Sequence, residues 1–231
     1  MQIKEAIILA GGLGTRLRDA VPDFPKCMAP VNGEPFISYV IDYLQQQGIN
    51  RFIFALGYRS ETFIQYLADK FPLENYEVVI EKDPLGTGGA IQFACMYAKE
   101  KNVVVVNGDS IFKTDLAKQA DIHFAVDAYC TLALKPMKNF ERYGLVELNP
   151  DQTIASFKEK QLYNEGLING GVYILNIPAF FNLYLPEKFS FETDYLQEYY
   201  SRKRIYGVVN DGYFIDIGVP EDYLKAQTEL K

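Results

Sequence analysis

The sequence predicts an α/β fold organised around a doubly wound, mostly parallel sheet. Short apolar runs alternate with amphipathic helical segments through the first half of the chain. One run, residues 103–106, consists only of valine and is typical of a strand that is buried on both faces. Another run, residues 3–10, leads directly into a glycine-rich loop. Such alternation of strands and helices favours a parallel sheet that carries helices on both faces.

The first half divides into strands and helices by its hydrophobic periodicity. Strands are expected at residues 3–10, 51–56, 76–81 and 103–106. Helices are expected at residues 35–47, 60–70 and 87–100. In the first of these helices Phe36, Val40 and Leu44 recur at helical spacing, and Gly48 follows as a C-terminal cap.

The second half has a different texture, with more strands and fewer long helices. Strands are expected at residues 129–135, 144–148, 154–159, 171–175, 204–209 and 213–217. The last two are expected to close the sheet. Helices are expected from residues 177 and 192 and from Pro220, which suits a first helical turn. No linker, repeat or low-complexity tract interrupts the chain, so residues 1–231 are expected to form a single domain.

Composition narrows the class of protein. The chain has 30 acidic and 23 basic side chains and a net charge of -7, which argues against nucleic-acid binding. Its single histidine, His123, argues against histidine-based metal sites and Ser-His-Asp triads. Cys27, Cys95 and Cys130 lack metal-ligand spacing and indicate reduced thiols. We find no signal-peptide pattern and no apolar run near the ~18 residues of a membrane span, so a cytoplasmic protein without a membrane partner is expected.

The glycine-rich loop at residues 11–16 carries the strongest functional signal. Its sequence, Gly-Gly-Leu-Gly-Thr-Arg, is not a P-loop, and the dinucleotide fingerprint would need glycine in place of Leu17. Glycines let backbone N–H groups approach a phosphate, and Arg16 and Lys26 add two cations to an otherwise acidic chain. We therefore expect a triphosphate site; the alternative is a tight turn flanked by surface cations.

Two acids occupy positions that suit a metal ion. Asp109 follows the valine strand, and Asp216 has apolar neighbours at the end of another predicted strand. A charged side chain in such surroundings is costly unless it is paired or bound to metal. Two carboxylates, triphosphate oxygens and water would complete the octahedral shell of Mg²⁺. The alternative is that both acids cap the segments that follow them.

Together these features resemble the sugar-phosphate nucleotidyltransferase family, whose signature is a glycine loop ending in Thr-Arg-Leu followed by a Pro-Lys segment. Further motifs of that family follow in the expected order at residues 81–89, 107–109, 143–144, 159–160, 169–173 and 216–220. Cys27 departs from the pattern, because proline is commoner at that position. The resemblance implies a Rossmann-like nucleotidyltransferase fold, with a nucleotide-binding portion at about 1–115 and a sugar-binding portion at about 116–231. It also implies transfer of a nucleotidyl group from a nucleoside triphosphate to a sugar 1-phosphate, with release of pyrophosphate.

The resemblance assigns roles to individual residues. The catalytic residues are Arg16, Lys26 and Asp109, and Asp109 binds Mg²⁺ together with Asp216. The nucleotide-binding residues are Leu9, Ala10, Gly11, Gly12, Gly14, Thr15, Glu81, Gly86 and Thr87. The sugar-phosphate-binding residues are Gly144, Glu159, Lys160, Asn169, Gly170 and Glu192. Without the resemblance, the adjacent Glu159 and Lys160 would be interpreted as a solvated strand face.

Glu81 bears on the choice of nucleobase. Guanine presents two adjacent donors, N1–H and the 2-amino group, and a carboxylate accepts both, whereas a uracil or thymine site would more naturally use glutamine. GTP is therefore the expected donor. Within the family, the chain length and the runs at 85–90 and 167–171 are most similar to the D-glycero-D-manno-heptose 1-phosphate guanylyltransferases. Mannose 1-phosphate guanylyltransferases are a close alternative, uridylyl or thymidylyl transfer stays open, and a catalytically inactive sensing module is the alternative from a different class.

Overall fold

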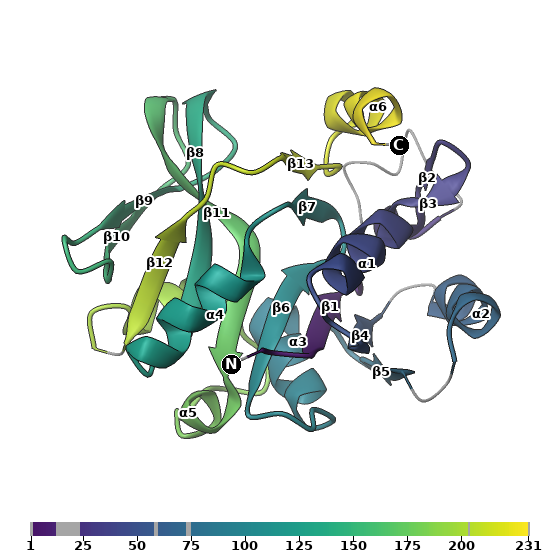
Figure 1. The fold of residues 1–231 in the computed structure, drawn as a ribbon, viewed down its shortest axis with the longest axis horizontal. Coiled ribbons are helices and arrows are strands. Elements are labelled where there is room, and N and C mark those ends of the chain that lie inside the picture. Colours follow the sequence, from purple (N-terminus) through teal and green to yellow (C-terminus); the bar gives the residue numbers. More distant parts are fainter. Residues whose placement is uncertain (1, 13–23, 58–59, 73–74, 203, 231) are drawn as a thin grey trace.

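The computed structural model describes residues 2–12, 24–57, 60–72, 75–202 and 204–230, and its centre is a nine-stranded sheet (Figure 1). Seven strands follow the order β10-β9-β11-β6-β1-β4-β5, and β8 pairs with both β11 and β12. The strands are β1 (Glu5–Leu9), β4 (Arg51–Leu56), β5 (Tyr76–Ile80), β6 (Asn102–Asn107), β8 (Cys130–Phe140), β9 (Leu145–Leu148), β10 (Ile154–Lys158), β11 (Tyr163–Asn176) and β12 (Ile205–Val209).

The four strands that the first half contributes to this sheet are parallel, which confirms the predicted fold class. β1 lies between β4 and β6, and β5 extends the row beyond β4. Residues 103–106 of β6 are at most 3% exposed, as expected for a strand that is buried on both faces. Because side chains alternate along β1, Ile7 belongs to the core cluster that contains Ile91, on one face of the sheet, and Ile8 belongs to the cluster that contains Phe36, on the other.

Helices cover both faces of this parallel row. Residues of α1 (Phe36–Gln46) share a core cluster with one face of the row, and residues of α3 (Gly86–Cys95) share one with the other. The other helices are α2 (Ser60–Lys70), α4 (Leu116–Ala125), α5 (Ile177–Phe181) and α6 (Pro220–Glu229). Two further turns are helical, the 3₁₀ helix η1 (Lys26–Met28) and the π-helix η3 (Phe191–Gln197). The sequence does not predict α4, although Asp115 caps it by accepting a hydrogen bond from the Lys118 N–H. Within the described ranges, no helix is both long and apolar enough to cross a membrane.

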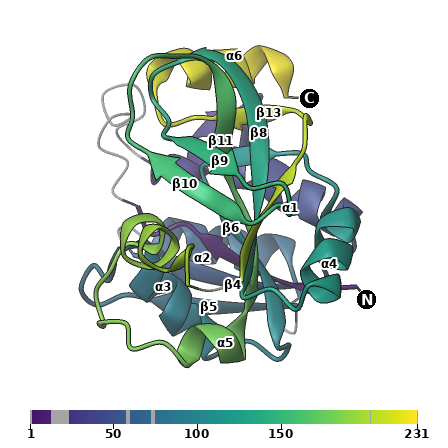
Figure 2. The ribbon, with the colours of Figure 1, turned by 90° about the vertical axis from the view of Figure 1, so that its left-hand side faces the viewer.

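The second half adds antiparallel strands to the parallel row. β11 runs antiparallel to β6, β8 and β9, and it is longer than the predicted strand at 171–175. In Figure 2, β8, β9, β10 and β11 gather in one part of the molecule below α6, whereas α3 and α5 lie in the opposite part. The division into two portions at about residue 115 stays a prediction.

One predicted pairing is wrong, because residues 213–217 do not close the main sheet. Within this segment β13 (Phe214–Asp216) pairs antiparallel with β7 (Ser110–Phe112), so the two form a separate two-stranded sheet. The partner of β13 is β7, which follows β6 closely in the chain, and Asp216 lies opposite Ser110. A second short hairpin joins β2 (Pro30–Val31) to β3 (Glu34–Pro35).

Candidate active site

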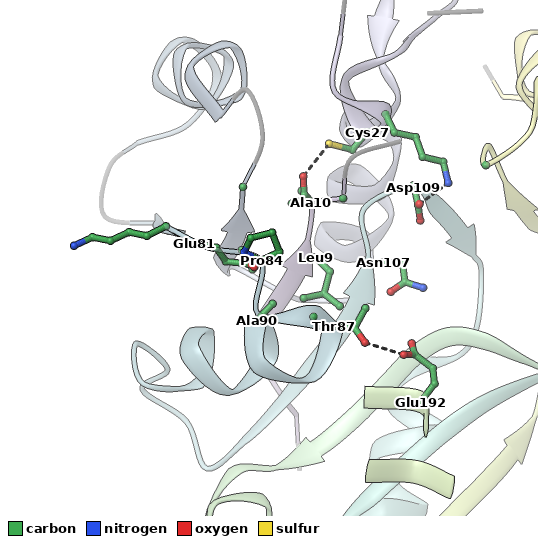
Figure 3. Close-up of a pocket in the computed structure, with 18 residues that line it drawn as sticks. Leu9, Ala10, Cys27, Glu81, Pro84, Thr87, Ala90, Asn107, Asp109 and Glu192 are labelled. Atoms are coloured by element: carbon green, nitrogen blue, oxygen red, sulfur yellow. Dashed lines mark hydrogen bonds and ion pairs between the residues drawn. The ribbon is translucent and has the colours of Figure 1, made fainter. Parts of the chain in front are cut away.

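A cavity of about 720 Å³ opens where the parallel strands β1, β4, β5 and β6 end (Figure 3). Carboxyl ends of parallel strands are the usual ligand-binding edge of an open α/β sheet. The predicted site residues that line this cavity are Leu9, Ala10, Gly11, Gly12, Lys26, Glu81, Gly86, Thr87, Asp109 and Glu192. The cavity is also lined by Asn107, Gly57 and Gly218, for which the sequence predicts no individual role. Arg16, Gly14 and Thr15 lie outside the described residues.

Lys26 connects the two predicted metal-binding acids. Its Nζ lies 2.5 Å from Asp109 Oδ2 and 3.3 Å from Asp216 Oδ1. Lys26 belongs to η1, which precedes α1, whereas the acids follow β6 and end β13. The Gly218 N–H donates to Asp216 Oδ1 over 2.8 Å, and a Cβ at Gly218 would lie only 2.8 Å from Lys26 Nζ. Three distant parts of the chain therefore form one compact charged cluster.

The pairing of β13 with β7 explains why the two acids meet. Asp216 lies opposite Ser110, the residue after Asp109, and the Ile217 N–H donates to the Asp109 carbonyl over 3.1 Å. Gly108 makes the turn possible, since a Cβ there would lie 2.9 Å from the Leu9 carbonyl oxygen. A metal ion at Asp109 and Asp216 would therefore be held at one end of this small sheet, with one acid from each strand segment.

The chemistry of this donor set fits Mg²⁺. Among the described residues there is no group of three or more His, Cys, Asp or Glu side chains that could hold a metal ion. Mg²⁺ is usually bound through one or two carboxylates, with substrate phosphates and water completing the shell, and seldom by an all-protein cage. Asp109 and Asp216 could supply those two carboxylates. Asp109 lines the cavity, whereas Asp216 lies behind that lining, 3.3 Å from the Nζ of Lys26, which lines it too.

Glu81 lies immediately after β5 at the other side of the cavity (Figure 3). Its Oε2 accepts a hydrogen bond of 2.8 Å from the Leu85 N–H, and its Oε1 would lie 3.2 Å from a Cβ at Gly11. Burial raises the pKa of the Glu81 carboxyl above its usual value, and the Leu85 hydrogen bond opposes that shift. The carboxylate is thus oriented between the glycine loop and the loop that precedes α3.

The glycines at the start of α3 contact the second half of the chain. A Cβ at Gly86 would lie 2.5 Å from the Phe189 carbonyl oxygen, and one at Gly88 would lie 2.1 Å from the Phe189 ring. A Cβ at Gly89 would lie 2.4 Å from the Glu187 carbonyl oxygen. The run at 86–89 therefore has a packing role that the sequence analysis missed, because nothing local identifies its distant partner.

Thr87 and Glu192 join the two halves at the cavity wall. The Thr87 hydroxyl donates to Glu192 Oε2 over 2.8 Å and accepts from the Phe191 N–H over 2.9 Å. The Ser190 hydroxyl also donates to Glu192 Oε2, over 3.2 Å. Glu192 lies in the π-helix η3, a rare geometry that is frequent at functional sites. Figure 3 shows both side chains at the cavity, joined by the Thr87–Glu192 hydrogen bond.

The other predicted sugar-phosphate residues do not line this cavity. Glu159 and Lys160 are exposed beyond the end of β10, and Gly144 packs against the Lys158 carbonyl. Asn169 donates to the Tyr173 hydroxyl over 2.8 Å and accepts from the Gly171 N–H over 3.1 Å.

A Cβ at Gly170 would lie 2.2 Å from the Phe112 ring, and a Cβ at Gly171 would lie 2.6 Å from Asn107 Nδ2. Since Asn107 lines the cavity, the Asn169–Gly171 bend adjoins it without opening into it. Of the predicted sugar-phosphate residues, only Glu192 lines the cavity together with the predicted nucleotide-binding residues.

Comparison with known proteins identifies the class of protein. The family model described as nucleotidyl transferase matches residues 5–231, and the chain belongs to that family. It is therefore an enzyme of the nucleotidyltransferase class. Members of this family generally use a divalent metal ion.

Three similar proteins span the whole chain. D-glycero-alpha-D-manno-heptose 1-phosphate guanylyltransferase of Aneurinibacillus thermoaerophilus is 49% identical over 98% of this chain and 98% of its own length. The protein of the same name from Campylobacter jejuni is 45% identical over 95% of this chain and 96% of its own length. The crystal structure of HddC from Yersinia pseudotuberculosis complexed with GMP-PN superposes with a TM-score of 0.86 at 36% identity, covering 99% of this chain and 100% of that one. These similarities confirm the predicted family resemblance and fold.

Proposed function

We propose that the enzyme transfers a guanylyl group from GTP to D-glycero-D-manno-heptose 1-phosphate, producing GDP-heptose and pyrophosphate. The observation that carries the proposal is the cavity in which Glu81 faces the glycine loop and Lys26 joins Asp109 to Asp216. Full-length similarity to two heptose 1-phosphate guanylyltransferases supports the donor and the acceptor. A related structure with GMP-PN bound supports a guanine nucleotide.

One group of nucleotide-binding residues contacts the triphosphate, and Glu81 contacts the base. Backbone N–H groups of Gly11 and Gly12 approach the phosphates, and Arg16 and Lys26 neutralise their charge. On the other side of the cavity, Glu81 accepts from guanine N1–H and from the 2-amino group. The other nucleotide-binding residues are Leu9, Ala10, Gly14, Thr15, Gly86 and Thr87.

The metal site of the proposal is Asp109 with Asp216. Mg²⁺ bound there would neutralise triphosphate charge next to the reacting phosphorus. Gly218 and the β7–β13 pairing orient the Asp216 carboxylate, and Gly108 orients Asp109. These contacts support a pair of acids that is fixed next to Lys26 before the substrates arrive.

The acceptor needs no strong base. Its phosphate monoester is already largely ionised near neutral pH, so one of its oxygens can attack the α-phosphorus directly. The new P–O bond forms in line with the bond that breaks to pyrophosphate, and Lys26 and Arg16 stabilise the departing charge. We assign the acceptor to Gly144, Glu159, Lys160, Asn169, Gly170 and Glu192.

Location in the cytoplasm is part of the proposal. Cys27, Cys95 and Cys130 are free and buried, and burial raises the pKa of the Cys27 thiol to about 12. Unpaired cysteines of this kind are typical of a reducing compartment.

A substrate screen tests the proposal. GTP, ATP, UTP and CTP are each combined with heptose 1-phosphate, mannose 1-phosphate and glucose 1-phosphate, with Mg²⁺, and pyrophosphate release is measured. The highest kcat/KM is expected for GTP with the heptose. Faster turnover of mannose 1-phosphate would reassign the acceptor, equal use of UTP would remove the guanine assignment, and no release with any pair would favour an inactive sensing module.

A further inference from the structure

We propose that Lys26 is an internal counter-ion that occupies the space between Asp109 and Asp216 and leaves it when the metal ion binds. The inference rests on the proposed metal site. It assigns Lys26 two alternating partners, the two carboxylates in the empty enzyme and the triphosphate in the loaded one.

The geometry of the cluster carries this proposal. A single ammonium group contacts both acids, at 2.5 Å and 3.3 Å, and only 14% of the Lys26 side chain is exposed. A dication coordinated by the same two carboxylates and an ammonium at these distances would repel each other strongly. The two cations therefore exclude each other from this space.

The surroundings of Lys26 limit how the ammonium can move aside. Gly218 lies so close that even a Cβ would come within 2.8 Å of Nζ, which blocks that side. Lys26 also lines the large cavity, where the proposed triphosphate would lie. Among the described residues, the cavity therefore gives the displaced ammonium a direction in which to move, toward the phosphates, which would replace the two carboxylates as its anionic partners.

This exchange has a thermodynamic consequence. A metal ion that binds without nucleotide must displace Lys26 from two carboxylates, and the lysine gains no new anion in return. When triphosphate is present, the displaced ammonium has a partner. Metal and triphosphate should therefore bind with positive coupling, beyond their direct contact with each other.

The first test measures binding of Mn²⁺ alone, by the loss of the free-ion EPR signal. Lys26→Met should bind Mn²⁺ about tenfold or more tightly than wild type, because two carboxylates lose a competing cation. Lys70→Met is the matched control, since the exposed Lys70 pairs with Glu34 at 3.7 Å and the substitution removes the same charge. Equal affinities for Lys26→Met and wild type would overturn the proposal.

A second test needs no variant at this position. Lysine amines of the wild-type enzyme are acetylated with and without Mg²⁺, and modification at each residue is quantified by mass spectrometry. Lys26 should be protected in the absence of metal and should react several-fold faster at saturating Mg²⁺, while Lys70 is unchanged. Unaltered Lys26 reactivity would contradict the exchange even if Lys26→Met failed to fold.

A double variant separates this inference from the metal site itself. Adding Asp109→Asn to Lys26→Met should abolish the gain in Mn²⁺ affinity. If the gain persists, Asp109 is not a ligand and the proposed metal site is wrong. If Asp109→Asn weakens Mn²⁺ binding to wild type but Lys26→Met does not strengthen it, the metal site stands and the counter-ion role is wrong.

Discussion

The two halves of the chain contribute to the site in different ways. In the first half, β1, β4, β5 and β6 run parallel, so the residues that follow these strands all lie at the same edge of the sheet. In the second half the strands are largely antiparallel, and residues of similar predicted role lie at different ends and faces. Glu192 reaches the cavity, whereas Lys160 is exposed away from it. In the first half, residues converge because the strands are parallel, whereas in the second half convergence depends on individual contacts such as the β13–β7 pairing that brings Asp216 to Asp109.

Removing the charge of a proposed metal ligand should have the largest effect on turnover. Asp109→Asn should lower kcat by ~10²-fold or more while the fold remains, because a ligand charge is lost next to the reacting phosphate. Asp216→Asn should behave alike, as both acids share Lys26. Pyrophosphate release at saturating Mg²⁺ and thermal unfolding measure the two properties. Near-normal turnover in either variant would remove that acid from the metal site.

Glu81 tests the base side of the same cavity. Glu81→Gln should cost ~2–4 kcal/mol in kcat/KM for GTP, because the amide presents a donor where guanine also has a donor. UTP should suffer far less. Inosine triphosphate, which lacks only the 2-amino group, should rank between GTP and ATP with the unmodified enzyme. An intact GTP preference in Glu81→Gln would refute the guanine contact.

Two glycines distinguish packing between the halves from phosphate binding. Gly88→Ala should destabilise the fold by ~1–3 kcal/mol, because its Cβ would lie 2.1 Å from the Phe189 ring. Gly12→Ala is the matched control, since a Cβ there meets no atom of the described residues within 4 Å. It should leave the unfolding midpoint in urea unchanged and raise the KM for GTP. An unchanged unfolding midpoint in Gly88→Ala would show that residues 187–189 can shift to accommodate the Cβ without loss of stability.

Lys160, which is exposed beyond the end of β10, tests whether the second half binds the sugar 1-phosphate at this position. Lys160→Met should raise the KM for the sugar 1-phosphate about tenfold, a value typical of one charge-assisted hydrogen bond. The KM for GTP should not change. Lys158→Met serves as control, because Lys158 pairs with Glu147 at 2.5 Å on the exposed strand surface. Equal effects of the two variants would leave Lys160 without a role in binding.

His123 tests a contact between the two halves, and its expected effect, on the pH dependence of stability, is the smallest of these predictions. It lies in α4 and is within 3.0 Å of Asn102 Oδ1 in β6 and 2.8 Å of the Thr131 hydroxyl. Burial lowers the His123 pKa from 6.5 to about 4. Between these values the unfolded chain binds the extra proton, so stability should fall as pH falls, by about 1 kcal/mol per pH unit below 6.5.

Urea unfolding at pH 7, 6 and 5 measures this dependence, and His123→Gln should lose this component of the slope. A slope unchanged in the variant would assign the pH dependence to other groups.

Local sequence determined much of this molecule. The valine run of β6 and the helical spacing of α1 are short-range patterns, and each produced the expected element at nearly the expected bounds. Ordered motifs along the chain determined the family, which the comparisons confirm. The predicted roles of Glu159 and Lys160 remain predictions.

Tertiary structure alone decided which distant segments meet. The pairing of β13 with β7 brings Asp216 to Asp109, and Lys26 reaches both across 83 and 190 residues of sequence. The packing of Phe189 on Gly88 joins α3 to the second half in the same way. Such contacts depend on the shape and register of complete surfaces, whereas periodicity records only which face of each element is apolar.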